Sequence, residues 1–267
     1  MSASPGPLDA LQVKQCCAQL YQSEVATFLL GDSFHPGGLR LTERLGERLG
    51  LSTGSNVLDV AAGRGTSALF LAEHFGCRVT GIDLGPQNVA EANQAASARG
   101  LGERVHFQCA DAESLPFESG HFDALVCECA FCTFPDKTRA ASEFARVLRA
   151  GGRAGLTDLT RAAVLPEALT GLLAWIACIA DAQPLEAYVD ILRSAGFSVA
   201  APEIYDEALH ELVRQVQGRL FTVEVLSGLK KLTLPDLDLS TAKQMTATAA
   251  RAIARRELGY ALIVGAL

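Results

Sequence analysis

The stretch Val57-Leu58-Asp59-Val60-Ala61-Ala62-Gly63-Arg64-Gly65 decides the fold. A short apolar run ends in this stretch, a glycine turn follows it at once, and residues 66–75 then show helical spacing. This order is typical of a strand-to-helix turn whose glycines let the backbone approach a ligand closely. The stretch therefore predicts a nucleotide site at the carboxyl end of a strand.

Strands and helices alternate outward from this turn. Their alternation predicts an α/β fold with a doubly wound, mostly parallel, seven-stranded sheet. The expected strands are 56–61, 78–83, 105–110, 122–128, 153–160, 198–205 and 259–267, and the helices within the alternating part are 66–75, 86–99 and 136–149. A very apolar helix is expected over 165–180, and an amphipathic helix over 185–195.

The chain divides into four expected segments. Residues 1–50 form an N-terminal helical segment, with helices over 8–30 and 39–49, and residues 51–206 form the core. Residues 207–258 form a helical insertion, and residues 259–267 return to the core as its final strand. The apolar faces of the insertion make it the candidate surface for a homodimer.

Composition excludes several classes of protein. The chain has 267 residues, 49% hydrophobic and 20% charged, which are values of a globular protein. A net charge of −7 argues against a nucleic-acid surface. We see no signal-peptide pattern over 1–7, and the longest apolar run, 171–180, is about half of the roughly 20 residues that a membrane span needs. We therefore expect a cytoplasmic protein with no membrane partner, whose eight cysteines are thiols.

Two further acids follow the glycine loop. Asp83 ends the second strand, where a carboxylate can accept both ribose hydroxyls of a nucleoside. Asp111 ends the third strand, where it can read an adenine amino group. Together these motifs resemble the class I S-adenosylmethionine (SAM)-dependent methyltransferases over residues 56–160, with Ala61 in place of the first glycine of the family loop.

The resemblance implies SAM as the cofactor and a small molecule as the methyl acceptor. It places Asp59 near the methionine ammonium, Asp83 at the ribose and Asp111 at the adenine. The residues that it assigns to cofactor binding are Asp59, Ala61, Gly63, Gly65, Asp83, Leu84, Asp111, Ala112 and Cys127.

Cysteines gather where the fourth strand ends, in Cys127-Glu128-Cys129-Ala130-Phe131-Cys132. On a strand, Cys127 and Cys129 would point to one face. Cys129 precedes Pro135-Asp136-Lys137 by six residues, and Cys178 follows it by 49 (178 − 129), which resembles the arsenite methyltransferases. That resemblance implies that Cys129 and Cys178 bind As(III), a soft centre that suits thiolates, as catalytic residues.

The sequence departs from that family, and alternatives stay open. A third family cysteine is absent near Gly31–His35, although Cys16-Cys17 lies earlier in the chain. The cysteines can instead be small buried hydrophobic residues. A structural zinc site usually has four ligands in paired units, and the cluster of Cys127, Cys129 and Cys132 has no clear partner pair. His35 is a candidate general base or substrate contact, or a loop histidine satisfied by its neighbours.

Three functions therefore remain. The first is methylation of arsenite. The second is methylation of another small molecule, such as a thiol, a sulfide, or a quinone-like carbon or oxygen centre. The third is SAM or metalloid binding without catalysis.

Overall fold

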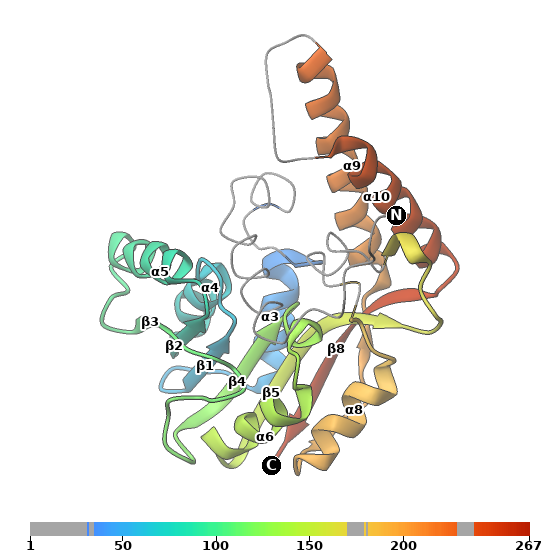
Figure 1. Cartoon of the computed structure of the whole chain (residues 1–267). Helices are drawn as coiled ribbons and strands as arrows, with labels where there is room; N and C mark the ends of the chain where they lie inside the picture. Colours follow the sequence, from blue (N-terminus) through green and yellow to red (C-terminus); the bar gives the residue numbers. More distant parts are fainter. Residues whose placement is uncertain (1–30, 32–34, 170–178, 180, 229–237) are drawn as a thin grey trace, which may run out of the picture.

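The structure is a computed structural model that describes residues 31, 35–169, 179, 181–228 and 238–267 (Figure 1). The helix predicted over 8–30 lies outside these residues, and so do Cys16, Cys17 and Cys178. Of the helix predicted over 165–180, the described part contains the short 3-10 helix η2 (Glu167–Leu169).

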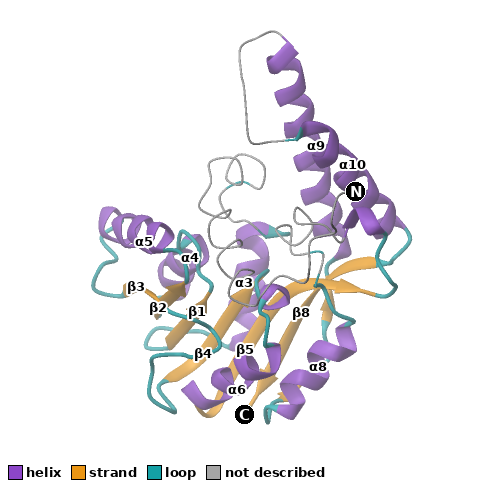
Figure 2. Cartoon of the chain, in the orientation of Figure 1, coloured by secondary structure: helices purple, strands orange, loops and turns teal. Residues whose placement is uncertain are grey.

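A twisted sheet forms the centre of the molecule (Figure 2). Its strand order is β3-β2-β1-β4-β5-β8-β6, and β7 also pairs with β8. The parallel strands are β1 (Asn56–Val60), β2 (Arg78–Asp83), β3 (Val105–Cys109), β4 (Phe122–Glu128) and β5 (Leu148–Arg161). The final strand β8 (Leu258–Ala266) runs antiparallel to β5. The strand order reverses between β1 and β4, which is where open sheets of this kind bind ligands.

Helices pack on the sheet in two groups. The first group contains α3 (Gly38–Leu49), α4 (Thr66–Phe75) and α5 (Pro86–Ala98), and the second contains α6 (Lys137–Val147) and α8 (Leu185–Ser194). In Figure 1, α3 lies behind the central strands, whereas α6 and α8 lie in front of them.

Helix α3 shows why the first group packs tightly. Its buried residues Leu41, Leu45 and Leu49 recur every four positions, so they form one apolar face. That face meets β5 at Gly155, where an added Cβ would lie 2.6 Å from Leu45 Cδ1. The missing side chain lets the helix approach the strand, and this positions the start of α3 near the end of β4.

The structure corrects two predicted boundaries. The strand expected over 198–205 is split into β6 (Ser198–Val199) and β7 (Glu203–Ile204), so the described sheet has eight strands instead of seven. Pro202 precedes β7 and has no N–H to donate, which is consistent with the interrupted ladder.

The helix expected over 136–149 ends at Val147. Leu148 is extended, with φ −80° and ψ 141°, and already pairs with Phe122 of β4. Strand β5 therefore begins before Gly151-Gly152, where we expected the helix to stop. Phe122 pairs with Leu148 and Ala124 pairs with Arg153, so the register shifts between these two pairs and accommodates the extra residues of β5.

The described part of the insertion is helical, as predicted. Helices α9 (Asp206–Gly228) and α10 (Leu239–Ala254) pack against each other and extend beyond the sheet (Figure 1). Asp238 caps α10 by accepting hydrogen bonds from Ser240 N and Thr241 N. Within the described residues, no helix has the length and apolar character that a membrane crossing requires.

Candidate functional site

The glycine loop leaves β1 with the backbone in an unusual conformation. Ala61, Gly63 and Gly65 have φ values of 58°, 53° and 79°, in the left-handed region that favours glycine. Ala62 N donates to Ile82 O at 2.8 Å, which joins the loop to β2. Gly65 then begins α4, so the loop ends at a helix N-terminus, where the partial positive charge and free N–H groups favour anions.

Asp83 is held rigidly at the end of β2. Its carboxylate accepts hydrogen bonds from Gly63 N at 2.9 Å, Gly85 N at 2.7 Å and Asn88 Nδ2 at 3.2 Å. Burial raises the pKa of Asp83, and these three hydrogen bonds oppose the rise. The donors fix the carboxylate so that its remaining lone pairs can accept from a ribose. The sequence analysis did not find Asn88, because its role depends on the geometry of the helix that follows β2.

Asp59 is buried at the end of β1, and its Oδ2 has no hydrogen-bond partner among the described residues. Burial raises the pKa of Asp59 well above its usual range, and the nearby carboxylates of Glu128 and Asp83 raise it further. An unpartnered buried carboxyl group with two acidic neighbours favours a cationic ligand. The ammonium and sulfonium of SAM meet this requirement, so the residues present fit the cofactor that the sequence implies.

The predicted adenine end of the site follows β3. Asp111 is half-buried and accepts a hydrogen bond from Glu113 N at 2.9 Å, whereas Ala112 is buried. Ala110 N donates to Asp83 O at 3.1 Å, so this turn lies beside Asp83. Leu84, which is 43% exposed, presents an apolar side chain at the same edge. These positions agree with the predicted cofactor contacts, which stay predictions.

Glu128 forms a second polar cluster at the end of β4, and the sequence analysis assigned it no role. Thr42 Oγ1 donates to its two oxygens at 3.2 and 3.1 Å, and Ser67 Oγ donates to Oε2 at 2.6 Å. The Nε2 atom of His35 lies 3.6 Å from Glu128 Oε2, and the two side chains are 3% and 4% exposed. Three side chains, His35, Thr42 and Ser67, therefore converge on the Glu128 carboxylate.

The three cysteines at the end of β4 have different surroundings. Cys127 and Cys132 are fully buried, whereas Cys129 is half-buried. The expectation that Cys127 and Cys129 share a face is wrong, because β4 ends at Glu128 and Cys129 turns to a φ of 53°. Burial raises the pKa of Cys127 well above its usual range, so that thiol is a core residue. Of these three cysteines, Cys129 is the least buried.

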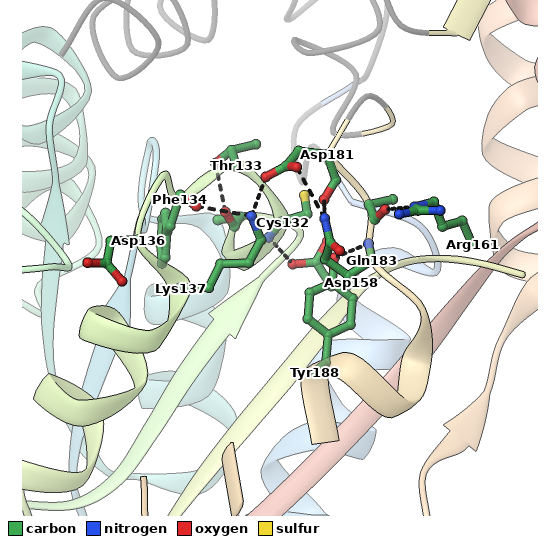
Figure 3. A network of polar contacts seen from close by, with 12 residues as sticks. Cys132, Thr133, Phe134, Asp136, Lys137, Asp158, Arg161, Asp181, Gln183 and Tyr188 are labelled. Atoms are coloured by element: carbon green, nitrogen blue, oxygen red, sulfur yellow. Dashed lines mark hydrogen bonds and ion pairs between the residues drawn. The ribbon is translucent and has the colours of Figure 1, made fainter. Parts of the chain in front are cut away.

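A polar network fixes the backbone beside Cys132 (Figure 3). Asp158 Oδ2 accepts from Cys132 N at 2.8 Å. The ammonium of Lys137 donates to Phe134 O at 3.0 Å and pairs with the carboxylate of Asp181. The network thus connects the loop after β4 with the segment that leads into α8.

No group of three His, Cys, Asp or Glu side chains within the described residues is arranged to hold a metal ion. Cys178, the second predicted As(III) ligand, lies outside those residues, so the thiol pair stays a prediction.

Comparison with known proteins agrees with the geometry. A family model described as "Methyltransferase domain" matches residues 57–152. The O-methyltransferase cnsE of Penicillium expansum is 32% identical over 258 residues, which are 90% of this chain and 87% of that protein. The alignments with two further curated relatives cover 62% and 47% of those proteins.

Two solved structures resemble the whole chain. The [4+2]-cyclase SpnF has a TM-score of 0.75 and 25% identity, and the match covers 100% of this chain and 98% of SpnF. A phosphoethanolamine N-methyltransferase of Haemonchus contortus in complex with SAM has a TM-score of 0.79 and covers 98% of this chain and 60% of that one. Its 19% identity shows the fold alone. None of these named relatives is an arsenite methyltransferase, so that resemblance stays a prediction.

Proposed function

The chain belongs to the class I SAM-dependent methyltransferases, and we propose that it methylates a small, soft acceptor, As(III) in the first instance, held at Cys129. The observation that carries this proposal is the half-buried Cys129, which lies next to Glu128 and directly after β4, the strand that pairs with β1. Cys129 adopts a left-handed backbone, an uncommon conformation that non-glycine residues often adopt at functional sites.

The residues around the β1 loop would hold the cofactor. Asp83 would accept the ribose hydroxyls, Asp59 would pair with the ammonium, and Asp111 would face the adenine. SAM, when bound, supplies a methyl group on a positively charged sulfonium. In the transfer the S–CH₃ bond would break, the lone pair of the acceptor would form the new bond, and the positive charge would pass from the sulfonium to the acceptor. The buried acidic groups Asp59 and Glu128 lie at this end of the sheet, where they would favour a positive charge.

A thiolate-bound acceptor suits this site for a chemical reason. As(III) bound by thiolates keeps a lone pair, so no proton has to be removed before a methyl group is accepted. The task of the protein is then to place the acceptor in line with the methyl group, which is catalysis by positioning. Cys129 would supply one thiolate, and Cys178 would supply the second by the family resemblance.

A second candidate is methylation of a hydroxyl on a small organic molecule. It is favoured by the relative that aligns with nearly the whole chain, which is named an O-methyltransferase. A hydroxyl acceptor must lose its proton, so this function requires a general base, and His35 is the candidate.

The decisive experiment compares acceptors and variants together. We would incubate the protein with SAM and either arsenite plus glutathione, a small thiol, or a panel of phenolic hydroxyls, and measure S-adenosylhomocysteine and the methylated product. The variant Cys129→Ser removes the proposed ligand, and Cys109→Ser is the matched control, because Cys109 is an exposed thiol on β3.

The expected result is arsenite turnover that Cys109→Ser keeps and Cys129→Ser loses. Arsenite turnover that survives in Cys129→Ser would refute the thiolate site. Turnover of a hydroxyl acceptor but not of arsenite would select the second candidate.

A further inference from the structure

We propose that His35 is a positioning residue that carries a proton on both ring nitrogens and clamps Glu128, and that it does not act as a general base. The proposal deepens the proposed function, on which it rests for the location of the reacting groups. It concerns four side chains from different parts of the chain: His35 before α3, Thr42 in α3, Ser67 in α4 and Glu128 at the end of β4.

The first ring proton follows from the partner of Nδ1. His35 Nδ1 lies 3.2 Å from the carbonyl oxygen of Pro36. A carbonyl oxygen only accepts hydrogen bonds, so Nδ1 must carry the proton in this contact. In a neutral imidazole, Nε2 would then be a bare acceptor.

The second ring proton follows from the atoms around Nε2. The Thr42 and Ser67 hydroxyl oxygens lie 3.4 and 3.5 Å from Nε2, and Glu128 Oε2 lies 3.6 Å from it. Each hydroxyl has a single proton, and both hydroxyl oxygens lie closer to Glu128 Oε2, at 3.1 and 2.6 Å, than to Nε2. Because a carboxylate oxygen only accepts hydrogen bonds, both hydroxyl protons are assigned to Glu128. A bare Nε2 would therefore face three oxygens and no donor. A protonated Nε2 faces a carboxylate instead.

Burial strengthens this conclusion. The side chains of His35 and Glu128 are almost fully enclosed, and Asp59 adds a further acidic group beside Glu128. A buried carboxylate without a cationic partner is strongly unfavourable, whereas an imidazolium within reach compensates its charge. The two hydroxyl groups alone supply hydrogen bonds but no charge.

The arrangement has a consequence for the reaction. A histidine with protons on both nitrogens has no lone pair to accept one from a substrate. His35 instead ties the start of α3 and the N-terminal turn of α4 to the end of β4, directly before Cys129. This is the arrangement expected for an acceptor that brings its own lone pair, and it disfavours a hydroxyl acceptor that relies on His35.

Nuclear magnetic resonance of the free protein tests the proton assignment without any acceptor. The chain has five histidines, and labelling with ¹⁵N-histidine reports how many protons each ring carries. The signals of His35 are assigned as those that disappear in His35→Gln. We expect the imidazolium pattern for His35 at pH 7, and a singly protonated pattern in Glu128→Gln, whose amide can donate to Nε2. In the matched control Thr42→Val, which removes a donor but no charge, the imidazolium pattern should persist.

A singly protonated His35 in the unaltered protein would overturn the proposal, and so would an imidazolium that survives in Glu128→Gln. Kinetics add an independent readout. His35→Gln should keep kcat within about tenfold, because Gln can still donate a hydrogen bond to Glu128. A loss of 10²- to 10⁴-fold in kcat with unchanged SAM binding is the signature of a general base and would also overturn it. Failure to find arsenite turnover would refute the acceptor alone, since the resonance measurement needs no acceptor.

Discussion

Replacing Gly65 by alanine tests whether the glycine loop is shaped by contact as well as by backbone conformation. Gly65 has a φ of 79°, and a Cβ added there would lie 2.5 Å from Phe107 Cζ and 3.0 Å from Ala92 Cβ. The substitution therefore combines two costs: a left-handed backbone for a residue with a side chain, and overpacking against an aromatic ring that is itself buried.

The two costs can be separated by magnitude. An alanine in the left-handed backbone region destabilises the folded state by about 1–2 kcal/mol. The lower conformational entropy of the unfolded chain offsets about 0.4–1 kcal/mol of this loss. Overpacking adds typically 1–3 kcal/mol. We therefore expect Gly65→Ala to lower the free energy of unfolding by about 2–4 kcal/mol. Because the loop carries Gly63, which donates to Asp83, the Kd for SAM should rise as well.

Gly100→Ala is the matched control. Gly100 follows α5 with a φ of 67°, but an added Cβ meets nothing within 4 Å. It should cost about 1 kcal/mol from the backbone alone and leave SAM binding unchanged. Urea unfolding gives both stabilities, and calorimetric titration with SAM gives the Kd. Equal losses of stability in the two variants would refute the argument that Phe107 shapes the loop.

Three further predictions concern other parts of the site. In Asp83→Asn, the amide N–H₂ must face the backbone N–H of either Gly63 or Gly85, so one hydrogen bond is lost. A hydrogen bond to a charged group is worth about 1.5–3 kcal/mol, so titration calorimetry should show a Kd for SAM about 10- to 100-fold higher. A double-mutant cycle of Lys137→Met and Asp181→Asn should give a coupling of about 1–2 kcal/mol in the free energy of unfolding. The value should lie toward the lower end of this range because the Asp181 side chain is 31% exposed. A coupling near zero would contradict the ion pair. Burial raises the pKa of Cys77 from 9.0 to about 11, so the stabilisation by this thiol is fully present below pH 9 and is lost as the pH rises through 11. The stability advantage over Cys77→Ala should shrink by about 1 kcal/mol between pH 8 and pH 10, at about 1.4 kcal/mol per unit of pKa.

The predictions for the cofactor side of the site, which stay predictions, rest on local patterns. The β1 loop and Asp83 are each recognised within a few residues, because a strand end and a glycine turn are local features. The bounds of α4 and β2 agree with prediction for the same reason. SAM as the cofactor and methyltransferase as the class of enzyme are confirmed by the family to which the chain belongs.

Features that depend on tertiary contact were missed. Helix α6 ends at Val147 because Leu148 pairs with Phe122 in a distant strand, and no local residue signals that pairing. The interruption of the strand over 198–205 did have a local signal, since Pro202 lies within it. The strict alternation of side chains failed at Cys129, because the rule applies only while the backbone stays extended.

Glu128 is the residue that sequence reasoning had least chance of finding. Its partners Thr42 and Ser67 lie 86 and 61 residues away in the chain. Only the folded structure shows that they and His35 all point to one carboxylate. In the sequence, Glu128 lies between Cys127 and Cys129. The functional interpretation of this stretch was therefore based on the cysteines and not on Glu128.

The structure also separates the tasks of two neighbouring carboxyl groups. Asp59 and Glu128 lie at the ends of the adjacent parallel strands β1 and β4, and the carboxylate of Glu128 makes a negative charge on Asp59 less favourable. Glu128 already has its donors, from Ser67, Thr42 and His35, whereas Asp59 Oδ2 has none among the described residues. Groups whose surroundings differ in this way take different roles. We therefore propose that Glu128 is the fixed charge that organises this end of the sheet, and that Asp59 is the group left available for the cation of the cofactor. That division explains how one end of the sheet can hold two buried acids and still have a place for a positively charged ligand.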